Sequence, residues 1–174
     1  MYTLNKISKL FAFLTILFCS IWIGAYISRL FLSYQLFEAQ DLSLKSYITP
    51  VNLTGILTTL LPAITTTFVS YICFIIAFGS FLLISQINLR NNGWLFIIVI
   101  ITLITSPIET YLMTIDYNII LQLNSSNFNQ TELIELFIRR IKVFGSFPLI
   151  EIFCYFSFYY FLLFRPLTKI KNEN

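Results

Sequence analysis

The chain has 174 residues, of which 57% are hydrophobic and only 11% charged, and its mean hydropathy is +0.82. These values exclude an ordinary soluble domain as the body of the protein. The net charge of +3 is modest, and we expect no nucleic-acid partner. Histidine is absent, which removes imidazole bases and the histidine ligands of haem and zinc.

Four long apolar stretches fill most of the chain. Residues 10–28, 46–89 and 94–108 carry no charge, and residues 143–164 carry only Glu151. Each stretch can cross a hydrocarbon core of about 30 Å, because a helix rises about 1.5 Å per residue. The sequence therefore predicts an all-α integral membrane protein whose main environment is the lipid bilayer.

We expect one transmembrane domain over residues 1–174, a four-helix bundle. The predicted spans are about 9–33, 58–85, 93–117 and 146–165. No small-residue cleavage site closes the first apolar run, so we interpret it as a retained anchor and not a signal peptide. A proline follows Thr49, which predicts that a short helix begins near residue 50 and bends at Pro62 into the second span.

The distribution of positive charge predicts the orientation of the bundle. Six positive residues share one side of the membrane if both termini are cytoplasmic: Lys6, Lys9, Arg90, Arg165, Lys169 and Lys171. The opposite loops hold four: Lys45, Arg139, Arg140 and Lys142. The positive-inside rule therefore favours cytoplasmic N- and C-termini, in a cytoplasmic (inner) membrane.

An amphipathic helix is predicted at about 130–144, between the third and fourth spans. Its charged stripe consists of Glu132, Glu135, Arg139 and Lys142, at spacings of 3, 4 and 3 residues. Its apolar face carries Leu133, Phe137, Ile138, Ile141 and Phe144. Such a helix lies in the membrane interface or folds over the bundle.

Small residues form a seam along the second predicted helix at alternating spacings of 4 and 3 residues. This small-residue seam consists of Thr59, Ala63, Thr66, Ser70, Cys73, Ala77 and Ser80. Ser20, Gly24 and Ser28 form a similar face on the first helix. Such seams let helices approach closely in lipid, either within this chain or against another subunit.

Ionisable residues within the predicted spans are the candidate functional residues, because charge is costly in lipid. Glu109 lies on a polar stripe that also contains Asp116, and Glu151 lies on a stripe with Tyr155. Helical rise places both glutamates about 21 to 23 Å from the cytoplasmic side, and Arg29 at about 30 Å or lower if its helix tilts.

Three interpretations of these charges remain open. Arg29 pairs with Glu109 or Glu151 to fix which helices touch; or one carboxylate binds a proton, cation or ligand in an outward-facing cavity lined by Thr66, Ser70 and Tyr155; or all three charges are hydrated at the surface.

No catalytic, metal or cofactor signature accompanies these residues. The three cysteines fall in the middle of predicted spans, where packing is their expected role. The sequence favours a non-catalytic accessory or scaffold subunit with other membrane proteins, or copies of itself, as partners. The alternative is a small oligomeric transporter or channel that uses Glu109 and Glu151. A membrane enzyme is the third option, because no nucleophile accompanies the glutamates.

Overall fold

A computed structural model describes residues 5–38, 40–125 and 129–168. The structure is all-helical: 82% of the described residues lie in helices, and the described ranges contain no strand. The helices are α1 (Lys6–Gln35), α2 (Pro50–Ser85), α3 (Gly93–Asn124), α4 (Gln130–Lys142) and α5 (Phe147–Phe164), with a short 3-10 turn, η1 (Leu89–Asn91). Among the described residues, α1, α2, α3 and α5 are long and apolar enough to cross a membrane.

The helices α1, α2 and α3 are longer than their predicted spans. Helix α2 begins at Pro50, where the sequence predicts a short helix, and continues into the span predicted from residue 58; α3 continues to Asn124 and not to residue 117. Helix α2 continues through Pro62 without interruption. Pro62 and Thr58 both lie on the exposed face, so the carbonyl that the proline leaves without an intrahelical partner is not sealed inside the core. The extra turns carry polar residues, which hydropathy counting assigns to loops.

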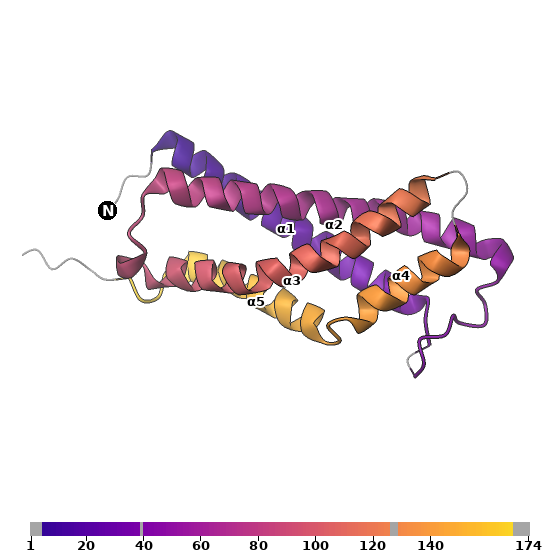
Figure 1. Cartoon of the computed structure of the whole chain (residues 1–174). Coiled ribbons are helices and arrows are strands. Elements are labelled where there is room, and N and C mark those ends of the chain that lie inside the picture. The colour runs from indigo at the N-terminus through magenta and orange to yellow at the C-terminus, as the bar shows by residue number, and fades with distance from the viewer. Residues whose placement is uncertain (1–4, 39, 126–128, 169–174) are drawn as a thin grey trace, which may run out of the picture.

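The chain runs back and forth along one long axis (Figure 1). The start of α1, the connection from α2 to α3 and the end of α5 lie at one end of the molecule, and the loop from α1 to α2 lies at the other. Helices α1 and α2 pack against each other more extensively than any other pair. The backbone N–H of Gly93 donates to the Leu167 carbonyl at 3.1 Å, which ties the segment after α5 to the start of α3.

Helices α4 and α5 pack against successive halves of α3. The break between them ends the predicted amphipathic helix at Lys142 instead of residue 144, and Gly145 takes the left-handed φ of +48°. Asn129 caps the start of α4 by accepting a hydrogen bond from the Thr131 N–H at 3.0 Å. The sequence predicts that this helix lies in the membrane interface or folds over the other helices. In the structure α4 packs along the other helices, with Leu133 and Phe137 buried.

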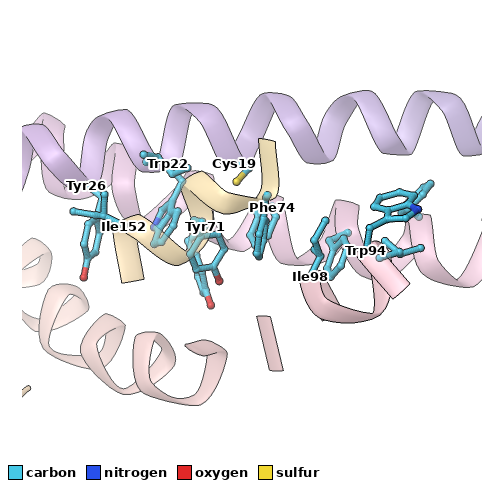
Figure 2. Close-up of a cluster of buried hydrophobic side chains, with 14 residues drawn as sticks. Cys19, Trp22, Tyr26, Tyr71, Phe74, Trp94, Ile98 and Ile152 are labelled. Atoms are coloured by element: carbon cyan, nitrogen blue, oxygen red, sulfur yellow. The ribbon is translucent and has the colours of Figure 1, made fainter. Parts of the chain in front are cut away.

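The buried apolar side chains form two separate clusters. The first lies toward the end where α1 begins and α5 ends, and in it the rings of Trp22, Tyr71 and Phe74 lie side by side at tilted angles (Figure 2). The second lies at the opposite end and includes Ile119 of α3 and Phe137 of α4. We call this second cluster the outer apolar cluster. Its contacts hold α4 against the other helices.

Candidate functional site

Five charged side chains are buried between the two apolar clusters. This charge cluster consists of Arg29 on α1, Glu109 and Asp116 on α3, Arg140 on α4 and Glu151 on α5. Their exposed fractions are between 0% and 9%. Glu109 and Asp116 are seven residues apart, two helical turns, so they share one face of α3. Ion pairs of the cluster join α1, α3 and α4, and a hydrogen bond from Tyr26 of α1 to Glu151 adds α5.

Asp116 is the centre of the ion pairs. Both terminal nitrogens of Arg29 donate to its carboxylate, Nη1 at 2.6 Å to Oδ2 and Nη2 to Oδ1. The Nε of Arg140 also donates to Oδ1, at 3.2 Å. Two-nitrogen contacts of this kind are among the strongest that a carboxylate makes in a protein. Asp116 thus links α1, α3 and α4.

The expected pairing of Arg29 with Glu109 or Glu151 is wrong, because its partner is Asp116. Helical rise explains part of the difference. Heights along α3 are counted from Trp94, near the start of the helix. Asp116 is 22 residues from it, about 33 Å, whereas Glu109 is only about 23 Å from it. The height of about 30 Å for Arg29 is closer to that of Asp116, but helical rise alone does not contain the tilt of α1, which decides the pairing.

Arg140 is a member of the cluster that the sequence analysis did not single out. It follows Phe137 by three residues and Leu133 by seven, which places it on the buried face of α4 and not in the charged stripe. Its Nη2 lies 3.6 Å from Glu109 Oε1, and its guanidinium lies 5.8 Å from the centre of the Tyr26 ring. Burial opposes the charge of Arg140, but the carboxylates of Asp116 and Glu109 outweigh burial and raise its pKa above the ordinary value.

Glu109 and Glu151 are the incompletely paired members. Glu151 Oε2 accepts a hydrogen bond from the Tyr26 hydroxyl at 3.2 Å. Its Oε1 and both carboxylate oxygens of Glu109 have no hydrogen-bond partner. Buried polar atoms without partners are uncommon and call for an explanation.

The other predicted cavity residues do not line a shared space with the glutamates. Thr66 is exposed, and the Ser70 hydroxyl donates to the Thr66 carbonyl of its own helix at 2.6 Å. Tyr155 is fully buried, with its hydroxyl 2.9 Å from that of Thr105. A cavity of about 30 Å³ does adjoin the cluster, but Tyr26, Arg29, Arg140 and other residues line it, not the glutamates.

The small-residue seam is only partly used within the chain. Ser70 and Ala77 are buried, whereas Thr59 and Thr66 are exposed, and the other three members are half-buried. Large side chains such as Phe74 fill the inner face of α2 instead. Packing in this helix therefore depends on aromatic and branched side chains more than on the seam.

A second cavity, of about 60 Å³, lies in the first apolar cluster, with Cys19, Phe74, Trp94 and Tyr159 in its walls. The three cysteines are unpaired. No group of three or more cysteine, aspartate or glutamate side chains in the described part of the chain is placed to hold a metal ion.

The four apolar helices support a multi-pass membrane protein as the class of this chain. No family model, no curated protein and no solved structure matches the sequence or the fold.

Proposed function

We propose that this protein is a non-catalytic accessory or scaffold subunit of a membrane complex, built as a four-helix bundle with both termini cytoplasmic. The observation that carries the proposal is an unoccupied face of α1. This open face consists of Gly24, Ser28 and Phe31, which are four and three residues apart and are all exposed. Ser20, one turn before Gly24, borders α5, with its hydroxyl 2.8 Å from that of Tyr159. No atom other than its own helix backbone and chain neighbours lies within 4 Å of a Cβ built at Gly24. A partner helix can therefore approach the α1 backbone closely there.

The exposed surface supports a membrane that covers only part of the length of the helices. In α2 the exposed side chains before residue 69 include Thr58, Thr59 and Thr66 beside Val51, whereas those from Val69 to Ile84 are all apolar. The apolar part from 69 to 84 is about 24 Å long, and the 18 residues of α5 are about 27 Å long. Both lengths are close to the hydrocarbon thickness of about 30 Å.

The same change occurs along α3. The exposed side chains of its first half include Phe96, Leu103 and Ile104, whereas those of its second half include the polar Thr110, Thr114 and Asn118 beside Tyr111, Tyr117 and Leu121. The change lies at the level of Glu109, so the charge cluster marks the outer membrane boundary in this proposal. The outer apolar cluster then stands in the aqueous phase, where Phe31 of α1 is exposed by 66%. An exposed aromatic residue beside Gly24 and Ser28 favours a protein partner for this face.

The positive charges support the proposed orientation. Lys6 and Lys9 at the start of α1, Arg90 in η1 and Arg165 after α5 lie at the same end of the molecule (Figure 1). The predicted contributions of Lys169 and Lys171 lie outside the described residues. This end is cytoplasmic by the positive-inside rule.

A matched pair of variants tests the subunit function. The protein is purified with an affinity tag in mild detergent, and native mass spectrometry measures the mass of the intact complex. We expect a complex of fixed stoichiometry, and we expect Gly24→Leu to reduce the yield of that complex at least about tenfold. Gly55→Leu is the control, because Gly55 of α2 is also exposed with no atom within 4 Å of a Cβ built there. A monomer in mild detergent, or equal losses in both variants, contradicts the proposal.

The second candidate function is a small oligomeric transporter or channel that uses Glu109 and Glu151. The unpartnered oxygens of these glutamates favour it. The test is flux of protons or alkali cations into liposomes that contain the purified protein. Flux that Glu109→Gln abolishes would favour transport over the subunit function.

A further inference from the structure

The carboxyl groups of Glu109 and Glu151 meet inside the charge cluster, although their helices α3 and α5 are separated by α4 in the chain. They lie close enough to share a hydrogen bond when one of them carries a proton. Their exposed fractions are 1% and 0%. Three of their four oxygens have no partner, and the fourth has only the Tyr26 hydroxyl. When both carboxylates are ionised, the oxygens of each only accept hydrogen bonds, so neither glutamate can donate one to the other.

The charges around this pair do not balance. The groups that face it are Tyr26 and Arg29 on α1, Tyr71 on α2, Asp116 on α3, Arg140 on α4 and Tyr155 on α5. With every carboxylate ionised, three negative charges oppose the two positive charges of the arginines. Asp116 takes hydrogen bonds from both arginines, and Arg140 approaches Glu109 only to 3.6 Å. One negative charge is therefore left in a buried position without its own counter-ion, which is costly.

A proton is the ligand that fits the available space. Neither glutamate lines either of the two cavities near the cluster and the aromatic core. A metal ion with its oxygen ligands needs a site with room for about six of them, whereas a proton needs only two facing oxygens. We propose that Glu109 and Glu151 together bind one proton. One carboxyl is then protonated and donates its O–H to the other, and the charge cluster is electrically neutral.

Tyr26 and Arg140 separate this proton site from the outside. Tyr26 contacts Glu151, Arg140 contacts Glu109, and both line the cavity of about 30 Å³ that opens beside Arg29 and Pro148. Exchange of the proton with water therefore occurs from this side, through the Tyr26 hydroxyl. The site does not depend on whether the protein has partners.

Infrared spectroscopy of the purified protein in lipid nanodiscs tests the proposal directly. A protonated carboxyl group has a C=O band that is distinct from that of a carboxylate and shifts on exchange into heavy water. We expect this band at neutral pH in the wild-type protein, and its loss in both Glu109→Gln and Glu151→Gln. The glutamine amide then supplies the hydrogen bond, and the remaining glutamate is ionised. Glu135→Gln, an exposed position on α4, should keep the band at full intensity.

Three results would overturn the proposal: no protonated-carboxyl band in the wild type at neutral pH, a band that persists in both glutamine variants, or a band that added sodium or potassium removes. The last result would assign a cation site. Helical circular dichroism and a single gel-filtration peak establish that each variant is folded. If a glutamine variant fails these checks, Tyr26→Phe replaces it. The band should then shift in position, since Glu151 loses the hydrogen bond from the Tyr26 hydroxyl, and an unmoved band counts against the site.

Discussion

Asp116 holds the arginines of two other helices, and it is the only carboxylate of the charge cluster whose hydrogen bonds come from charged donors. A buried ion pair of this kind contributes little compared with a well-packed apolar core. Loss of one member is costly all the same, because the other charge is left without a partner. The pair therefore specifies which helices touch more than it adds to stability.

A double-mutant cycle measures this coupling. Arg29→Ala should lower the free energy of unfolding by about 3–5 kcal/mol, because the bidentate partner of Asp116 is lost. Arg29→Ala combined with Asp116→Asn should cost at least about 1 kcal/mol less than the sum of the single changes. The measurement is chemical unfolding in mixed micelles. The control cycle pairs Arg29→Ala with Glu132→Gln, at an exposed position, and strictly additive losses in both cycles would refute the contact.

At the scale of elements, α4 is a packed helix and not a loop. Its charged stripe is exposed, while Leu133 and Phe137 have exposed fractions of 0% and 1%. These side chains complete the outer apolar cluster, which α2 and α3 cannot close alone. Helix α4 thus brings Arg140 to the charge cluster.

Truncation of the α4 anchor should loosen the outer end of the molecule. Phe137→Ala should cost about 3–5 kcal/mol, because it removes a fully buried ring and leaves a cavity. Phe153→Ala, on the exposed face of α5, should change stability by less than about 0.5 kcal/mol. Hydrogen exchange in detergent checks the location: amides of α4 should lose protection in Phe137→Ala, and uniformly fast exchange of α4 already in the wild type would show that the helix is not docked.

Two glycines at helix positions should respond in opposite directions to alanine. A Cβ at Gly93 would lie 2.7 Å from the Cβ of Leu167 and 3.1 Å from its carbonyl oxygen, so Gly93→Ala should cost about 1–3 kcal/mol by overpacking. Gly55→Ala meets no atom within 4 Å and should stabilise by about 0.4–1 kcal/mol, since it restricts the unfolded chain. Thermal unfolding of both variants checks the pair, and equal shifts would mean that the contact with Leu167 is absent in solution.

On the scale of the whole molecule, the two apolar clusters have different surroundings in our proposal. The first cluster lies within the bilayer and the outer apolar cluster lies beyond it, with the charge cluster between them. Charged groups at a membrane boundary retain access to water on one side, which lowers the cost of their burial.

Spin labels along α2 test where the membrane ends. Cysteines replace Thr59 and Ile76, one at a time, in a protein whose native cysteines are changed to alanine. The two positions are 17 residues apart, about 26 Å. We expect a water-soluble nickel reagent to relax the label at residue 59, and oxygen to relax the label at residue 76. Oxygen dominance at both positions would contradict a partly covered helix.

Thiol labelling in sealed cells tests the orientation. In the same background, a cysteine at Ser46, in the loop from α1 to α2, should react with an impermeant reagent. A cysteine at Asn88, between α2 and η1, should react only after permeabilisation, because the positive end is cytoplasmic in our proposal. Reaction at residue 88 in intact cells would reverse the topology.

The sequence by itself determined the elements. Apolar runs that exceed the thickness of a bilayer predict four long helices, and a 3-4-3 charge spacing predicts an amphipathic one at 130–144; helices in the structure occupy all five regions. Both signals are local, because helical hydrogen bonds connect residues four apart. The end of α3 was missed because hydropathy shows how far an apolar run extends and not where its helix ends.

Only the tertiary structure decided the partners. Arg29 binds Asp116 and not Glu109 or Glu151, and Arg140 joins them from a helix outside the predicted spans. The small-residue seam contributes little to packing within the chain, since only Ser70 and Ala77 among its members are buried. Pairing across helices depends on tilt and on the relative height of neighbouring elements, and residue spacing within one helix contains neither quantity.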